Sequence, residues 1–188
     1  ASSTRGVFMG RAVAPNTSNE IEFVTIASEG NALDFGDLVE TKHTMGVAGN
    51  ATRGIAVGGN PSNTTMNYVT ISTTGNAADF GDLVNIKKYA ASASNAVRGL
   101  WANGNASDPS LVVYQVIDYV TIATLGNALD FGDMNYDESH GGATASATRY
   151  IHFGGSTSAP NFVNNISYVQ IMTTGDAIDF GDLLNPVE

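Results

Sequence analysis

Short runs of apolar and β-branched residues alternate along the chain with polar, glycine-containing turns, and no segment has the apolar spacing of a helix. The second of four similar units shows this most plainly. Its predicted strands are RGIAVGG at 53–59, YVTIS at 68–72, the DFGD-containing segment at 77–84 and the small-residue segment YAASASNA at 89–96. Glycine pairs and Gly-Asn turns separate these runs. The pattern predicts an all-β protein with four short antiparallel strands per unit.

The unit occurs four times, and two of its segments have a fixed length. DFGD begins at Asp34, Asp79, Asp130 and Asp179, which gives periods of 45, 51 and 49 residues. An aromatic residue precedes each motif by eleven positions, and an arginine follows the first three by nineteen. A period of this length indicates a repeat architecture. We therefore expect one domain over residues 1–188, with repeats at roughly 1–41, 42–86, 87–137 and 138–188.

The small-residue strands at 45–51, 89–96 and 141–147 avoid bulky side chains in every copy. Crowding at the axis of radially packed four-stranded sheets explains this composition. Only three such strands are present against four of every other kind. The sequence leaves two alternatives open: a ring that closes with one three-stranded sheet, or four repeats of a larger propeller.

These motifs resemble a Kelch-type β-propeller. The resemblance rests on the glycine doublets at 58–59 and 154–155, the aromatic-led strand that follows, and Phe80 with Leu83 in the next strand. The doublet position is Met9-Gly10 in the first copy and Asn103-Gly104 in the third. The combination of YVTI, GNAxDFGDL and TRGV or TRGI is similar to propeller-like repeats in virion proteins of tailed phages, especially cyanophages. The resemblance implies a Kelch-like β-propeller of four blades, or part of a larger one.

Composition excludes several classes of protein. A hydrophobic content of 43% with 14% charged residues is that of a folded chain, and no apolar run is long enough to span a membrane. The net charge of −10, with eight Lys and Arg, argues against nucleic acid as a partner. The absence of cysteine excludes disulfides and thiolate metal sites. Because the chain opens at Ala1, we expect it to be part of a longer or processed protein.

Four arginines share one repeat position, and eight aspartates share two more. These are Arg5, Arg53, Arg98 and Arg149, with Asp34, Asp37, Asp79, Asp82, Asp130, Asp133, Asp179 and Asp182. We expect a structural role in which each guanidinium pairs with a carboxylate of the same or a neighbouring repeat. The alternative is that the carboxylates bind Ca²⁺, which takes six to eight oxygen ligands. We expect no cofactor otherwise, and the three histidines lack the spacing of a metal site.

The variable connections are the candidate binding surface. They span 11–19, 60–67, 105–118 and 156–167, and equivalent connections in a propeller emerge on one face. The candidate residues in them are Asn16, Asn60, Asn63, Asn105, Asp108, Tyr114, Asn161 and Phe162. The alternative is that these connections vary only because nothing restrains them.

Three functions fit these observations. The first is a non-enzymatic structural protein of a phage virion, in a tail fibre, appendage or decoration. It would contact other virion proteins or copies of itself, and a host surface glycan through many weak contacts. The second is a secreted, extracellular carbohydrate-binding lectin or adhesin. The third, an enzyme such as a glycan lyase or hydrolase, needs paired carboxylates in one cleft, but eight of the eighteen acidic residues belong to the repeat motif.

Overall fold

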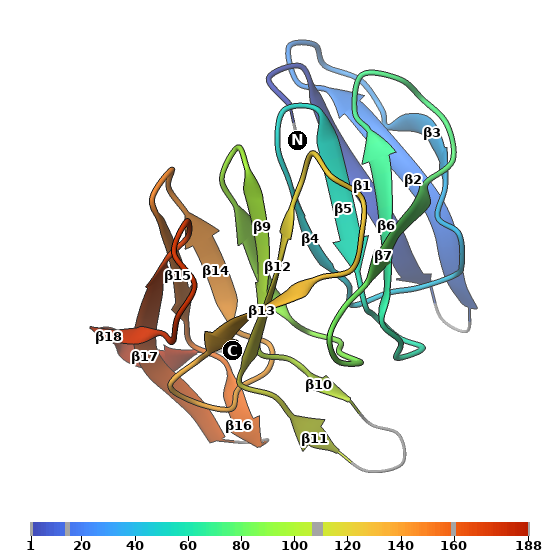
Figure 1. Ribbon diagram of the computed structural model, residues 1–188. Helices are drawn as coiled ribbons and strands as arrows, with labels where there is room; N and C mark the ends of the chain where they lie inside the picture. Colours follow the sequence, from blue (N-terminus) through green and yellow to red (C-terminus); the bar gives the residue numbers. More distant parts are fainter. Residues whose placement is uncertain (1, 14–15, 107–110, 159–160, 188) are drawn as a thin grey trace.

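The chain is all-β in the computed structural model, which describes residues 2–13, 16–106, 111–158 and 161–187 (Figure 1). These residues form eighteen strands and no helix. Each sequence repeat forms one antiparallel sheet, and we number the sheets one to four along the chain. The predicted fold class is therefore confirmed as far as antiparallel all-β sheets. No helix of the described residues is long and apolar enough to cross a membrane.

Each sheet begins with the small-residue strand where one is present, so the segment at 89–96, predicted as the last strand of the second unit, forms the first strand of sheet three. Sheet one consists of β1 (Arg5–Val13), β2 (Asn16–Thr25) and β3 (Leu33–Asp37). Sheet two consists of β4 (Gly46–Gly49), β5 (Arg53–Val57), β6 (Thr65–Thr70) and β7 (Ala78–Asp82). Sheet three consists of β8 (Ala91–Ser94), β9 (Arg98–Ala102), β12 (Val116–Thr121) and β13 (Leu129–Asp133). Sheet four consists of β14 (Gly142–Ala145), β15 (Arg149–Phe153), β17 (Asn161–Gln170) and β18 (Ile178–Val187), with β16 (Ser156–Ser158) paired to β17. A separate hairpin joins β10 (Asn105–Ala106) to β11 (Val112–Val113).

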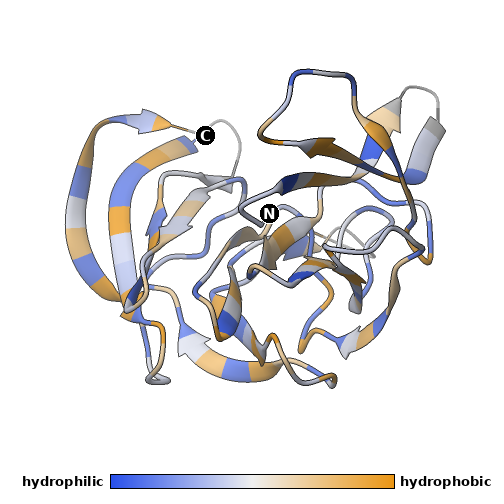
Figure 2. Cartoon of the chain, turned by 90° about the horizontal axis from the view of Figure 1, so that it is seen from above, coloured by the Kyte–Doolittle hydropathy of each residue, from blue (hydrophilic) through white to orange (hydrophobic). Residues whose placement is uncertain are grey.

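The small-residue strands β4, β8 and β14 lie side by side, as the sequence predicts. Ser92 Oγ lies 3.0 Å from both the backbone nitrogen and the carbonyl oxygen of Val47, so β8 and β4 are joined through a side chain. A Cβ atom on Gly46 would lie 2.6 Å from the Trp101 ring. Because no space remains there, only small residues fit. Figure 2 shows the sheets standing around this centre.

The hydrophobic core lies between successive sheets. Phe80 and Met66 of sheet two pack with Trp101 and Ile122 of sheet three, and similar clusters fill the spaces between sheets one and two and between sheets three and four. Within every sheet the aromatic residue that opens the YVTI segment contacts the DFGD phenylalanine edge to face, as for Tyr68 and Phe80 at 5.9 Å. The aromatic positions of the repeat thus form the contact layers.

The four sheets do not form a closed ring in the described part of the chain. Sheet one has three strands and sheet four has its extra strand β16, and no strand pairing joins these two sheets. They form the two ends of the row, blue and orange-red in Figure 1.

One detail of the repeat alignment was wrong. The first residue of the glycine doublet has a left-handed backbone, with φ of 60° at Gly58, 58° at Asn103 and 62° at Gly154. Gly10 has the same conformation, with φ of 62°. The counterpart of the doublet in the first repeat is therefore Gly10-Arg11 and not Met9-Gly10. Glycine or asparagine is required there because a left-handed backbone is costly for most other residues.

Candidate functional site

The DFGD motifs lie in the seams, which we define as the contacts between each sheet and the next. At the seam between sheets two and three, the Phe80 carbonyl accepts a hydrogen bond from the Gly126 amide at 2.8 Å. The Asp82 carbonyl accepts one from the Ala128 amide at 2.8 Å, and the Asp82 amide donates to Asn127 Oδ1 at 3.2 Å. The same three bonds recur between sheets one and two and between sheets three and four. The strand that carries DFGD is therefore an edge strand, and it contacts the turn that precedes DFGD in the following repeat.

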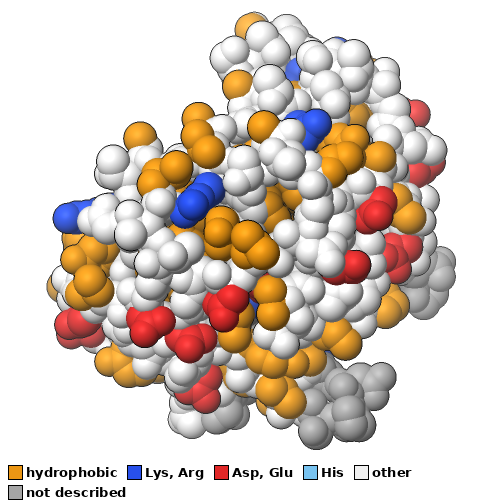
Figure 3. All heavy atoms as spheres, in the orientation of Figure 1, with side chains coloured by type: hydrophobic (Ala, Val, Ile, Leu, Met, Phe, Trp, Pro, Cys, Tyr) orange, Lys and Arg blue, Asp and Glu red, His pale blue; other side chains and the backbone are white. Residues whose placement is uncertain are grey.

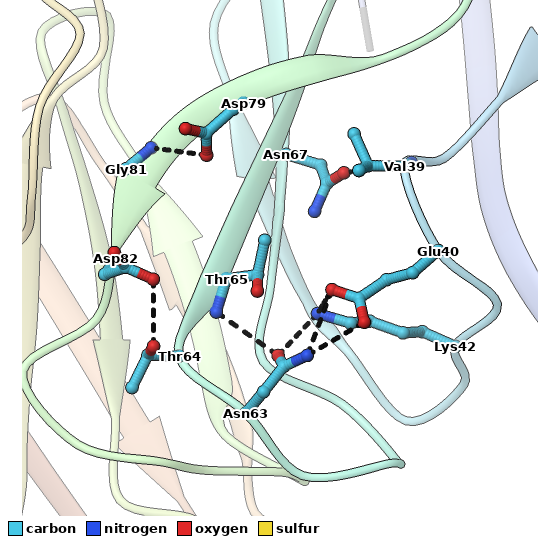
Figure 4. A network of polar contacts seen from close by, with 10 residues as sticks. All are labelled: Val39, Glu40, Lys42, Asn63, Thr64, Thr65, Asn67, Asp79, Gly81 and Asp82. Carbon is cyan, nitrogen blue, oxygen red and sulfur yellow. Dashed lines mark hydrogen bonds and ion pairs between the residues drawn. The ribbon is translucent and has the colours of Figure 1, made fainter.

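The glycine of DFGD permits this close contact. Gly81 has φ of 143°, and a Cβ atom there would lie 2.5 Å from the carbonyl carbon of Gly126. The two aspartates are bound locally: Asp79 Oδ1 accepts from the Gly81 amide at 3.2 Å, and Asp82 Oδ1 accepts from Thr64 Oγ1 at 2.8 Å (Figure 4). Among the described residues, no group of three or more His, Asp or Glu side chains is placed to hold a metal ion.

The predicted pairing of the repeat arginines with DFGD carboxylates is wrong, since the ion pairs of the described residues include none of this kind. Each guanidinium instead lies over the aromatic ring of its own sheet, at 5.0 Å for Arg53 and Tyr68. Three of the four also donate across a seam to a backbone carbonyl, as Arg53 does to the Ile122 carbonyl at 2.8 Å. Arg5 and Arg98 make the same two contacts. The physical reason is that packing places the guanidinium between its own aromatic ring and the backbone of the next sheet, where a carbonyl can accept its hydrogen bond, while Asp79 and Asp82 accept local bonds.

The variable connections lie at the lower end of the sheets in Figure 1, and three of them contain paired strand residues. In the first, strand pairing continues outward, with Arg11 opposite Ser18. In the fourth, β16 pairs with the start of β17. The third contains the β10–β11 hairpin, and only the second lacks strand structure before Thr65. Pairing extends into these segments because it satisfies backbone groups that a loop would leave to water.

Three of the predicted binding residues have structural contacts. Asn60 Nδ2 lies 3.1 Å from His43 Nε2. Asn63 binds Glu40 and Lys42, as Figure 4 shows. Asn105 is buried in β10. These side chains hold the connections in place and are poorly placed to meet a ligand.

Three of the other predicted residues are more open. Asn161 and Phe162 are exposed at the start of β17, and Tyr114 is half-buried beside the β10–β11 hairpin. Asn16 begins β2. Asp108 lies outside the described residues. The hairpin also exposes Leu111 and Val112, so the third and fourth connections present apolar side chains to solvent.

Charged groups are buried in the seams, a feature that sequence reasoning missed. Lys87, in the segment between β7 and β8, pairs with Asp118 of sheet three, and both side chains are fully buried. Burial lowers the pKa of Lys87, which the carboxylate of Asp118 opposes. The equivalent Lys42 pairs with Glu40 and also donates to Asn63. The recurrence of lysine five residues after the motif, at 42 and 87, was a visible signal.

The third seam has a carboxyl group at the position that lysine occupies in the first two. Glu138 occupies the place of Lys87, and its Oε2 lies 3.5 Å from Nδ1 of the buried His152. Burial raises the pKa of Glu138 to about 7, although a hydrogen bond from Asn165 acts against this. Burial lowers the pKa of His152 to about 4. Both groups are therefore neutral over part of the acidic range.

Two cavities recur at one repeat position, between the aromatic strand and the turn that precedes DFGD. One, of about 240 Å³, is lined by Arg98, Tyr119, Leu125 and Asn127 among others. The other, of about 190 Å³, is lined by Tyr68, Thr74 and Asn76 among others. An aromatic ring beside turn amides and hydroxyls is a combination that suits a small polar ligand.

A third cavity, of about 440 Å³, lies where the inner strands end. It is lined by the residue at the same position in each of the four repeats: Ser2, Asn50, Asn95 and Ser146. Each of these side chains accepts hydrogen bonds from two backbone amides, that of the repeat arginine and that of the residue before it. Asn50 accepts in this way from Thr52 and Arg53, both at 2.9 Å. The polar residue three positions before each arginine was a further signal in the sequence.

Acidic side chains spread over the face shown in Figure 3, where basic ones are sparse. We found no match to this chain among protein-family models, and none among curated proteins.

Proposed function

We propose that this chain is a non-enzymatic structural module of a tailed-phage virion, built as Kelch-like propeller blades, with each sheet as one blade. The observation that carries the proposal is the repeated seam. Three successive seams use the same backbone bonds, arginine contacts and aromatic layers, so the four sheets form one rigid body. Such a body holds its variable connections at fixed spacing along one side.

The variable connections then serve for contact with other virion proteins or with a host surface. Val112 is exposed on β11, with Leu111 directly before it, and Phe162 is exposed at the start of β17, so none of these side chains lies in a long free loop. Residues held on paired strands lose less backbone freedom on binding than residues on a free loop. Many copies on one particle multiply weak contacts.

The test is electron microscopy of native particles labelled with an antibody raised against this chain. Labelling of tail fibres, appendages or the capsid surface supports the proposal. The outcome that contradicts it is recovery of the chain only as a free protein, with no label on any particle.

A second function, carbohydrate binding by a secreted lectin or adhesin, is favoured by the two tyrosine-lined cavities. We would measure glycan-array binding of the parent and of Leu125→Arg, because Leu125 lines the larger cavity and its side chain is exposed. Leu33→Arg is the matched control, since Leu33 in sheet one is 59% exposed, against 51% for Leu125, and lines neither cavity. Binding that Leu125→Arg removes and the control keeps would favour the lectin.

A further inference from the structure

The two ends of the row of sheets carry the two halves of one seam. We call the DFGD side of a sheet its forward face and the side that meets the preceding DFGD its rear face. Sheets one to three use their forward faces and sheets two to four use their rear faces in the three seams. The forward face of sheet four and the rear face of sheet one have no neighbouring sheet among the described residues.

Side chains that are buried in the seams are exposed at these two faces. Phe180 on the forward face of sheet four is 51% exposed, whereas its counterparts Phe35, Phe80 and Phe131 are each 2% exposed. On the rear face of sheet one, Ile26 is 56% exposed, whereas its counterparts are at most 1% exposed; these are Ile71, Ile122 and Ile171. Phe8, also on that rear face, is 58% exposed. Trp101 holds the same repeat position in sheet three and is completely buried. Both ends are thus apolar where the repeat places a seam.

The polar groups of a seam are also present at the two ends. Arg149 lies over Tyr168 at 4.9 Å, as the other repeat arginines lie over their rings, but its guanidinium has no carbonyl acceptor across a seam in the described chain. The matching acceptor is the carbonyl of Ile26, the counterpart of Ile71 and Ile122. The counterparts of the docking amides of Gly75 and Ala77 are those of Gly30 and Ala32, which have no backbone acceptor among the described residues.

The backbone at both ends already has the shape that docking requires. Gly181 has φ of 138°, close to Gly81, but a Cβ atom there would meet nothing within 4 Å. Gly30 has φ of 155°, close to the 150° of Gly75. Because the faces are preformed, docking costs little conformational entropy.

We propose that the forward face of sheet four docks onto the rear face of sheet one of a second copy of this chain, forming a fourth seam. A second copy is the favoured occupant because the contact continues an interface that the chain forms three times, and every copy supplies both halves. The contact is head to tail, so it closes into a ring or extends into a filament. It does not depend on the proposed function.

The experiment is sedimentation velocity of the 188-residue chain over micromolar concentrations, with the monomer at 19.5 kDa. We expect species of two or more copies. Phe180→Asp on the forward face and Ile26→Asp on the rear face should each raise the dissociation constant at least about 100-fold, because each places an unpaired charge in the centre of the contact. Leu129→Asp is the matched control: Leu129 is 59% exposed although sheet three has a neighbouring sheet on both sides, so no seam covers it, and this variant should associate like the parent.

A mixture of the two variants tests the head-to-tail geometry. Ile26→Asp keeps an intact forward face and Phe180→Asp keeps an intact rear face, so an equimolar mixture should form dimers and nothing larger. Circular dichroism of each variant establishes that it is folded, and Gly181→Ala provides a second block that leaves charge unchanged. A parent that stays at 19.5 kDa, or an Ile26→Asp variant that associates like the parent, would overturn the proposal.

Discussion

Lys87 Nζ lies 2.5 Å from Asp118 Oδ2, and neither side chain is accessible to solvent. The other oxygen of Asp118 accepts the backbone amide of Val84 at 3.0 Å, and Lys87 also donates to the Val116 carbonyl at 3.1 Å. The pair therefore connects sheets two and three through charge and backbone together. Because each charge is buried, each depends on the other for compensation.

Removal of one member of this pair should be strongly destabilising. Asp118→Ala leaves Lys87 buried without a counter-charge, and we expect the free energy of unfolding to fall by about 3 to 5 kcal/mol in urea titrations. The double variant Lys87→Met with Asp118→Asn should recover most of this loss, because Asn67 already serves in the equivalent place and binds the Val39 amide. A double variant as unstable as Asp118→Ala would contradict this account.

The close approach at the DFGD glycine predicts a difference between two matched substitutions. Gly81→Ala and Gly181→Ala introduce the same strain, since φ is 143° and 138°. Only Gly81→Ala also drives a Cβ atom against the Gly126 backbone. We expect Gly81→Ala to lower the free energy of unfolding by about 2 kcal/mol more than Gly181→Ala. The measurement is urea unfolding at a concentration where the protein is monomeric, and equal losses would show that the seam tolerates the added atom.

The cross-seam bond of the repeat arginine can be separated from its ring contact. Arg53→Met removes both the contact with Tyr68 and the bond to the Ile122 carbonyl. Arg149→Met removes only a ring contact in the monomer. We expect Arg53→Met to be about 1 kcal/mol more destabilising in thermal or urea unfolding.

Asp79→Asn is the control for the rejected ion pair. The amide oxygen can still accept from Gly81, so this variant should be nearly as stable as the parent. A large loss in the free energy of unfolding would restore the ion-pair interpretation.

The buried carboxyl of Glu138 predicts a pH dependence of stability. Its pKa is raised from 4.5 to about 7, so the stability that comes from its neutral form is fully present below pH 4.5 and is lost as pH rises through 7. At about 1.4 kcal/mol per pKa unit the loss is at most about 3.5 kcal/mol, and solvent screening reduces it to about 2 kcal/mol. Glu138→Gln cannot ionise and keeps an oxygen for Asn165. Its stability relative to the parent should therefore rise by that amount between pH 4.5 and 8.

The measurement for Glu138 is urea unfolding of parent and variant at several pH values. Subtracting the two profiles removes His152, whose lowered pKa of about 4 acts with the opposite sign, since its contribution is lost as pH falls from 6.5 through 4. The exposed Glu29→Gln serves as the control and should parallel the parent. A constant difference between Glu138→Gln and the parent would contradict the burial of this carboxyl.

The strands and repeats could be predicted because their signals are local. Alternation of β-branched and aromatic residues gave the position of β6 to within a few residues, and the recurrence of DFGD gave the repeat boundaries. The crowding of the small-residue strands was also predictable, since side-chain volume is a property of composition. The role of the candidate binding residues was less predictable. Asn60, Asn63 and Asn105 are held by neighbours that the sequence does not place beside them.

The sequence by itself therefore determined the strand segments and the equivalence of positions between repeats, because both depend on neighbours in the chain. Only the tertiary structure decided which groups meet across a seam. Arg53 contacts Tyr68 and the Ile122 carbonyl rather than an aspartate, because the packing of sheets sets the distance between residues far apart in sequence. The same packing buries Lys87 with Asp118 and leaves Phe180 exposed at the end of the row. Every repeat carries the same two contact faces, but only the faces that have a neighbouring sheet are buried.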